Sequence, residues 1–209
     1  MIKIDRLKSN YERSSLESVR AALSRYGALS DEAWEDACER FYEYQMEAGE
    51  FFLEAGEVAR YCGFVLHGVL REFFITLEGQ EFNKNFSLEG EFTGSLFDLI
   101  SPEPSTASIQ AITPARVLVF RFTDLQDLYR RYREWERTGR LLAEDLFMLK
   151  ARREWEFMTL AAEQRYILLL QRNPDLEKRI SQYHLASHLG ISPVSLSRIR
   201  RRLGRSKPK

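Results

Sequence analysis

The stretch QYHLASHLGISPVSLSRIRRRL, residues 182–203, carries the most specific structural pattern in this chain of 209 residues. Ala186 is small where a second helix would cross the first, and Gly190 follows four residues later at a turn that needs positive φ. Ser192 suits the cap of the second helix, and Pro193 suits its first position, whose amide has no helical partner. The stretch therefore predicts a helix-turn-helix. Apolar side chains stand where two such helices bury them against each other: Leu185, Leu189, Ile191, Leu196 and Ile199.

The same stretch lies in a basic block. Residues 178–209 contain nine Lys and Arg residues and no acidic residue, although the whole chain has no net charge. A disordered basic tail has this composition too, but the pattern inside the block favours a folded binder of a polyanion. Arginine recognises guanine by donating two hydrogen bonds to its O6 and N7 atoms, and other basic side chains neutralise backbone phosphates. We expect the second helix, residues 192–203, to contact duplex DNA through Ser192, Pro193, Val194, Ser195, Ser197, Arg198, Arg201 and Arg202.

From Phe41 to Arg121 the sequence has the texture of a β domain. Short aromatic or β-branched runs are separated by glycines that recur about every 7–12 residues. This spacing favours an antiparallel barrel, sandwich or jelly roll over a parallel sheet. Pro102 and Pro104 interrupt the series and predict a loop over residues 98–106. Two short helices are expected before it, over residues 15–25 and from the Ser30 cap to about residue 40.

The β domain is followed by a helical stretch. Thr123 and Gln126 have the spacing of a capping box, and a longer helix is expected from about residue 134 to residue 158. This longer helix carries two apolar stripes on different faces, so it needs two partners. We expect the first stripe to form a homodimer; burial of the helix on two sides of one domain is the alternative. The first stripe is Trp135, Leu142, Leu146 and Leu149, and the second stripe is Phe147, Ala151, Trp155 and Met158.

Several classes of protein are excluded. The chain has no hydrolase, phosphate-loop or metalloprotease motif, so we expect no enzyme. His184 and His188 share a helical spacing, but no further ligand follows them, and Cys38 and Cys62 stand far apart, so we expect no metal. No apolar run could cross a membrane and no secretory signal opens the chain, which predicts a cytoplasmic protein without a membrane partner.

The order of these elements resembles the Crp/Fnr family of transcriptional regulators. The resemblance runs from about Asp31 to Leu203 and is strongest in AEQRYILLLQRNPDL and YHLASHLGISPVSLSRIRRRL. It implies an α+β chain with an antiparallel β-roll or jelly-roll sensor domain (residues 1–122), a long dimerisation helix (123–158) and a C-terminal helix-turn-helix domain of the winged-helix kind (159–209). It also implies that the second helix enters the major groove and that RNA polymerase is a further partner.

The resemblance extends to the effector site only in part. Family members that bind cyclic nucleotides have a Gly-Glu pair and, ten residues after the Glu, an Arg followed by Ser or Thr. The matching run here is GEFTGSLFDLISPEPSTAS, residues 90–108, in which Ser95 replaces the Glu and Ser105 replaces the Arg. Without that arginine the phosphate has no partner cation, so we expect no cyclic AMP and no other cofactor. The effector-pocket candidates are Gly94, Ser95, Leu96, Ser105 and Thr106; Arg71 and Arg116 are the cations that could substitute.

Two functions remain open. The leading one is a homodimeric regulator that reads a two-fold-symmetric DNA site through residues 192–203, with a β-roll whose effector is unknown or lost. The alternative is a small-molecule sensor whose basic C-terminal segment docks a protein or RNA. A symmetric, salt-dependent footprint on duplex DNA distinguishes the two, because a docking tail has no reason to bind two spaced half-sites.

Overall fold

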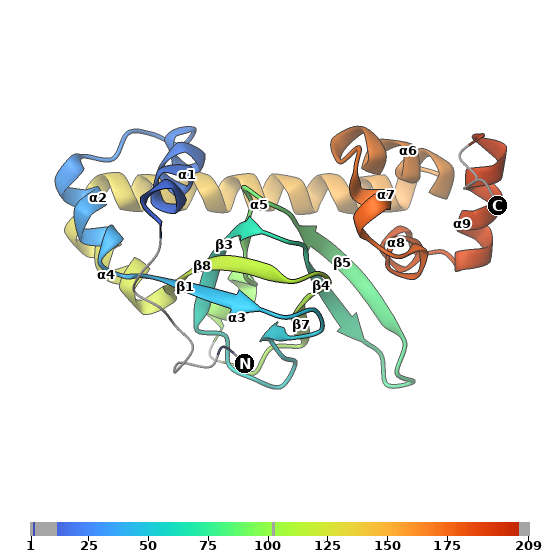
Figure 1. The fold of residues 1–209 in the computed structure, drawn as a ribbon, viewed down its shortest axis with the longest axis horizontal. Coiled ribbons are helices and arrows are strands. Elements are labelled where there is room, and N and C mark those ends of the chain that lie inside the picture. The colour runs from blue at the N-terminus through green and yellow to red at the C-terminus, as the bar shows by residue number, and fades with distance from the viewer. Residues whose placement is uncertain (1, 3–11, 102, 205–209) are drawn as a thin grey trace. The chain divides into compact units, whose positions relative to one another are not determined.

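The computed structural model describes residues 2, 12–101 and 103–204 (Figure 1). The chain divides into two units, one formed by Met1–Glu72 and Phe86–Phe147 and the other by Phe73–Asn85 and Met148–Lys209. This division differs from the three consecutive segments that the sequence suggested. A strand hairpin from the β region groups with the C-terminal unit, and the long helix contributes to both units.

The strands form a β-roll of two four-stranded sheets, which confirms the expected fold class. The strand pairs β1–β8, β3–β8, β3–β6 and β2–β7 are all antiparallel. In spatial order, the first sheet contains β1 (Phe41–Met46), β8 (Ala115–Arg121), β3 (Tyr61–His67) and β6 (Phe92–Thr93). The second sheet contains β2 (Phe51–Leu53), β7 (Ala107–Ala111), β4 (Leu70–Ile75) and β5 (Glu81–Ser87).

Strand β8 is buried on both faces. Val117 and Val119 belong to the apolar core between the two sheets, whereas Leu118 and Phe120 belong to a second core shared with helices. Alternate residues of a strand point to opposite sides of a sheet. The first sheet therefore separates the interior of the roll from a layer of helices.

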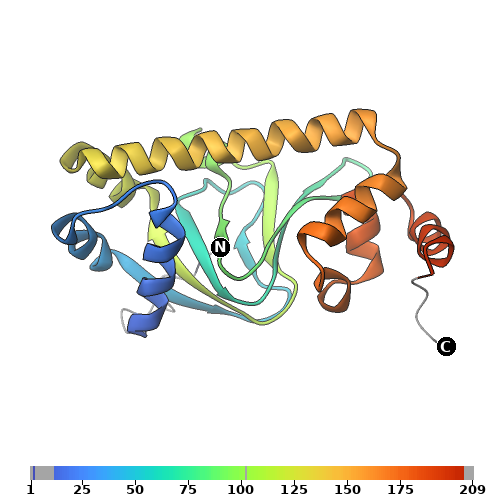
Figure 2. The same cartoon turned by 90° about the horizontal axis from the view of Figure 1, so that it is seen from above.

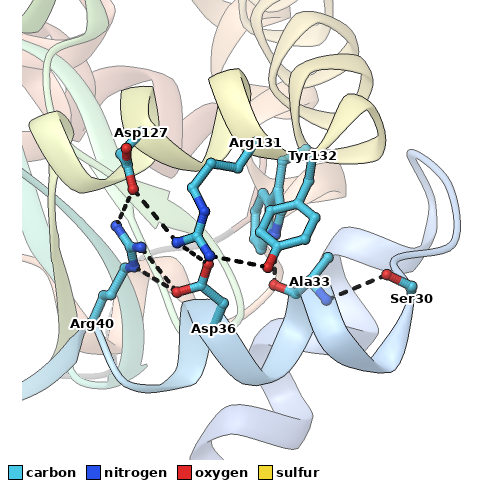
Figure 3. A network of polar contacts seen from close by, with 8 residues as sticks. Ser30, Ala33, Asp36, Arg40, Asp127, Arg131 and Tyr132 are labelled. Atoms are coloured by element: carbon cyan, nitrogen blue, oxygen red, sulfur yellow. Dashed lines mark hydrogen bonds and ion pairs between the residues drawn. The ribbon is translucent and has the colours of Figure 1, made fainter.

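That helical layer consists of α1 (Arg13–Ser24), α2 (Asp31–Cys38), α4 (Phe122–Arg131) and the first half of α5 (Arg133–Thr159). Charged side chains join α2 to α4 (Figure 3). Arg40 donates to Asp36 at 2.9 Å and to Asp127 at 2.9 Å, and Arg131 lies 2.5 Å from Asp36. The network fixes α2 against α4 at the edge of the second core.

Two local predictions in this unit were wrong. Helix α4 begins at Phe122 with Arg121 as its cap, so Thr123 lies inside the first turn and does not cap the helix. The stretch that was expected to be a loop from residue 98 includes the end of a short helix, α3 (Leu96–Ile100). Ser30 does cap α2, since its hydroxyl accepts a hydrogen bond from the Ala33 amide at 3.3 Å.

The second unit contains α6 (Ala162–Arg172), α7 (Leu176–Arg179), α8 (Gln182–Leu189) and α9 (Pro193–Arg202), coloured orange to red in Figure 2. Their core includes the leucines that the helix-turn-helix pattern marked, because Leu185, Leu189 and Leu196 are all buried. No helix among the described residues is both long and apolar enough to cross a membrane.

Candidate DNA-binding and effector sites

The turn between α8 and α9 is set by Gly190. Its φ of 69° is left-handed, and a Cβ built there would lie 2.4 Å from a ring carbon of Phe157. The chain closes the turn with a hydrogen bond from the Ile191 amide to the Ala186 carbonyl at 3.0 Å. Both the conformation and the crowding therefore require glycine at this position.

Helix α9 begins as the sequence predicts. The Ser192 hydroxyl accepts a hydrogen bond from the Ser195 amide at 3.2 Å, and Pro193 occupies the first turn. Leu196 and Ile199 are buried against the rest of the unit. Because these two side chains fix the rotation of α9, the opposite face of the helix points outward.

The outward face of α9 carries most of the predicted DNA-binding residues. Val194, Ser197, Arg198 and Arg201 are exposed, as are Ser192 and Pro193 at the start of the helix. Within the described residues, Arg198 and Arg201 form no ion pair, so both guanidinium groups are available to a partner. Ser195 is half-buried, and its hydroxyl lies 3.0 Å from that of Ser192.

Arg202 is placed differently from its neighbours. Its guanidinium forms an ion pair with Glu163 on α6. This contact draws the side chain back toward its own unit. Arg202 is exposed like Arg198 and Arg201, but unlike them it has an acidic partner in the described chain.

Arg200 is a structural residue of α9 that sequence reasoning missed. It is buried, and its Nε atom lies 3.2 Å from a carboxylate oxygen of Glu177 on α7. Glu177 also accepts a hydrogen bond from the hydroxyl of the buried Tyr166 on α6. A signal was available, because Arg200 follows Leu196 by four residues and so falls on the buried face of the helix.

The strand hairpin of the second unit packs against α8. Ser187 donates from its hydroxyl to the Glu81 carbonyl at 2.8 Å, and the same oxygen accepts from the Asn83 amide at 3.0 Å. The buried ring of His188 lies 3.2 Å from the Asn83 carbonyl through Nδ1 and 3.0 Å from Arg153 through Nε2. The hairpin and the first helix of the motif thus share polar contacts that local patterns did not predict.

Burial lowers the pKa of His188 to about 3, and the neighbouring Arg153 cation contributes to this lowering. The ring is therefore neutral at pH 7. A neutral ring with its proton on Nδ1 can donate to Asn83 and accept from Arg153. No group of three or more His, Cys, Asp or Glu side chains that could hold a metal occurs among the described residues, and His188 is engaged by Asn83 and Arg153.

The predicted effector residues do not form one polar pocket. Ser95 and Ser105 are buried, whereas Thr106 is exposed. Ser105, which stands where the arginine of the nucleotide-binding members would be, donates to the buried carboxyl group of Asp98 at 2.9 Å. An acidic side chain thus lies beside the position where the resemblance would put a phosphate.

The two arginines that could replace the missing cation already have partners. Arg71 is buried and donates to the Gln110 side chain at 2.7 Å. Arg116 forms an ion pair with the buried Glu43 at 3.2 Å. Either side chain would have to leave its acceptor in order to bind an anion.

The first stripe of α5 packs largely within its own unit. Trp135, the first member of the predicted dimer stripe, is 4% exposed and donates from its indole to the Ala33 carbonyl at 2.9 Å in its own unit. Leu142 and Leu146 are half-buried and face the first sheet of the same unit. Leu149 alone among the four is exposed. Burial within its own unit removes Trp135 from the predicted dimer interface, whereas Leu142 and Leu146 are only half-buried there.

The second stripe lies on the opposite face of α5. Phe147 is 68% exposed, Trp155 57% and Met158 78%, with the small Ala151 between them. These side chains recur at helical spacing along one continuous helix. The second stripe is thus the apolar surface of α5 that remains open to a partner.

Comparisons with known proteins agree with this architecture. Residues 43–132 match the family model of the cyclic nucleotide-binding domain. A search of curated protein sequences found no significant match. Among solved structures, FixK2 from Bradyrhizobium japonicum has a TM-score of 0.69 and 18% identity, over 78% of this chain and 83% of that chain.

Two further structures are similar over most of their length. A protein assigned to the crp/fnr family of transcriptional regulators, from Eubacterium rectale, has a TM-score of 0.67 and 14% identity, over 87% of this chain and 88% of that chain. CLP, a c-di-GMP-responsive global regulator from Xanthomonas campestris, has a TM-score of 0.64 and 17% identity, over 84% of this chain and 92% of that chain. Residues 43–132 therefore belong to the cyclic nucleotide-binding domain family, and the chain has the fold of the Crp/Fnr regulators.

Proposed function

We propose that the protein is a transcription regulator that binds duplex DNA through α9. The observation that carries the proposal is the outward face of this helix, where Arg198 and Arg201 are exposed and form no ion pair within the described chain. Buried Leu196 and Ile199 and the Arg200–Glu177 pair hold the helix in one orientation behind that face. A rigid helix with unpaired arginines suits insertion into the major groove, where arginine recognises guanine.

The regulator acts as a homodimer that pairs through the second stripe of α5. Each large apolar side chain transferred from water into an interface contributes about 1.5–3 kcal/mol, so three of them from each subunit favour association. Ala151 in the middle of the stripe allows two helices to approach closely. A two-fold dimer places two copies of α9 on a two-fold-symmetric DNA site.

The β-roll serves as a sensor whose effector is not a cyclic nucleotide. The carboxyl group of Asp98 beside Ser105 and the engagement of Arg71 and Arg116 leave no cation for a phosphate in this part of the unit. We assign the protein to the cytoplasm, with RNA polymerase as a further partner at the promoter.

The test is selection of genomic duplex fragments by the purified protein, followed by footprinting of the bound fragments. We expect two protected half-sites whose centres lie about 34–36 Å apart or a multiple of that distance. Affinity should fall steeply as salt rises, because binding releases counterions from the phosphates. Equal affinity for unrelated RNA, or protection without two half-sites, would favour the sensor with a docking tail and contradict the proposal.

A further inference from the structure

An apolar cavity of about 120 Å³ lies between the first sheet and the helical layer of the first unit. Its wall combines residues of β3, β6, β8, α1, α4 and the first half of α5. Leu118 and Phe120 line the cavity, whereas Val117 and Val119 of the same strand fill the core between the sheets. The cavity therefore lies mainly on the helical side of the first sheet. It borders the core between the sheets at Leu99, which lines the cavity and also packs against that core, and of the predicted effector residues only Gly94 and Leu96 line it.

Hydroxyl groups interrupt this apolar wall. Thr138 is 2% exposed and Thr93 is 5% exposed, yet neither hydroxyl makes a hydrogen bond within the described part of the chain. Neither oxygen belongs to the fully buried side-chain atoms that lack a partner in the described chain, so both keep some accessible surface. Most polar groups in protein interiors are paired, and a ligand in the cavity could supply the partner. The pattern suits a bound molecule that brings its own hydrogen-bonding group to Thr138.

The wall has no charge with which to hold an ion. It contains no Lys, Arg, His, Asp or Glu residue. Burial raises the pKa of the Cys62 thiol and of the Tyr129 phenol to about 12, so both groups are neutral at physiological pH. A charged ligand would lose its hydration without gaining a partner, so the cavity favours an uncharged one. A haem iron would find neither a histidine nor a thiolate in this wall.

We propose that the cavity binds a small uncharged molecule, about the size of one substituted benzene ring, whose single hydrogen-bonding group meets Thr138. A dry cavity of about 150 Å³ lined by apolar side chains is known to bind benzene, which sets the scale. Binding is independent of the proposed function. An effect of the bound molecule on dimerisation rests on that function. Such an effect is expected because Thr138, Gly139 and Leu142 of the wall lie on the same helix as the proposed dimer stripe.

The first test uses phenol and toluene as probes of nearly equal shape, in titrations of the DNA-free protein followed by NMR. We expect saturable binding of both probes with a Kd of about 1 mM or tighter. Thr138→Val removes the hydroxyl and keeps the shape of the side chain. It should weaken phenol relative to toluene by roughly threefold to tenfold, the value of one hydrogen bond. An unchanged ratio of the two affinities would overturn the role of Thr138.

The second test fills the cavity. Ala143→Leu adds methylene groups to the wall and should weaken both probes at least about tenfold, whereas Glu136→Leu, an exposed change on the same helix outside the wall, should not. Thermal unfolding verifies that each variant is folded, and the phenol-to-toluene ratio of Thr138→Val keeps the proposal testable if Ala143→Leu is not. A wild-type protein that binds neither probe, or a folded Ala143→Leu variant that binds both normally, overturns the proposal whatever the DNA assays give.

Discussion

Arg198 and Arg202 are both arginines of α9, yet their surroundings differ. Arg198 is exposed without an ion pair in the described chain, whereas Arg202 is paired with Glu163. Arg198→Ala should therefore weaken specific DNA binding by about 1–3 kcal/mol and relax the preference at one base pair of each half-site. Arg202→Ala should have a smaller effect and leave the base preference unchanged. Gel-shift titrations against the selected site and single-base variants measure both, and equal losses for the two changes would contradict this division.

His188 makes the stability of the second unit depend on pH. The unfolded chain binds a proton at this residue near pH 6.5, but burial holds the pKa of the folded state at about 3. The contribution of the neutral ring is thus fully present above about pH 6.5 and is lost as the pH falls toward 3.

The free energy of unfolding should fall by up to about 1.4 kcal/mol per pH unit across this window because of His188. Urea unfolding of the protein at pH 7, 6 and 5 measures the slope. His188→Gln has no titrating ring and is the control for the carboxylates that also titrate there. A variant with the same slope as the wild type would show that His188 is not the group responsible.

At the scale of elements, the structure differs most from the sequence-based prediction in which face of α5 is covered by its own chain. A stripe of apolar residues indicates that a helix face is covered, but not whether its own chain or a second chain covers it. Trp135 of the first stripe contacts Ala33 in its own unit, and the exposed second stripe is the surface that we propose for a second subunit.

Trp155→Glu combined with Met158→Glu should convert the dimer to a monomer, because charged groups would be buried at the interface without partners. Leu142→Ala should leave the dimer intact and lower the stability of the first unit by about 2 kcal/mol, since it removes packing within one chain. Sedimentation and thermal unfolding measure the two effects. A dimer that survives the double change would locate the interface on another surface.

At the scale of the whole molecule, the fold of a cyclic nucleotide-binding domain is present, but Arg71 and Arg116, the cations considered for a phosphate, have other partners in the described residues. Transfer of the phosphate out of water is costly without a paired cation. Ser105 supplies no charge and donates its hydrogen bond to Asp98.

Cyclic AMP at physiological concentration should therefore neither bind the protein nor change its affinity for DNA. Calorimetry with cyclic AMP and cyclic GMP tests the first statement, and gel-shift assays with each nucleotide test the second. Micromolar binding that also strengthens DNA binding would mean that Arg71 or Arg116 leaves its present partner to meet the phosphate.

The sequence by itself determined the elements of this protein. The strands other than β6, the length of α5 and the turn at Gly190 could be predicted because each depends on neighbouring residues: apolar periodicity, a capping side chain, or a backbone that only glycine tolerates. The helix-turn-helix was the clearest case, since all its requirements fall within 22 residues. The two-residue β6 and the five-residue α3 were missed, because so short a stretch shows no periodicity.

Tertiary structure decided which side chains are exposed and unpaired, and so can contact a partner or a ligand. Packing against other segments buried Trp135, paired Arg202 with Glu163 and brought Asp98 to Ser105. It also joined residues 73–85 to α8 and formed the cavity beside Thr138. These arrangements depend on contacts between segments that in most cases are far apart in the chain. A local pattern predicts that a face is apolar or basic, but only the folded chain determines what that face meets.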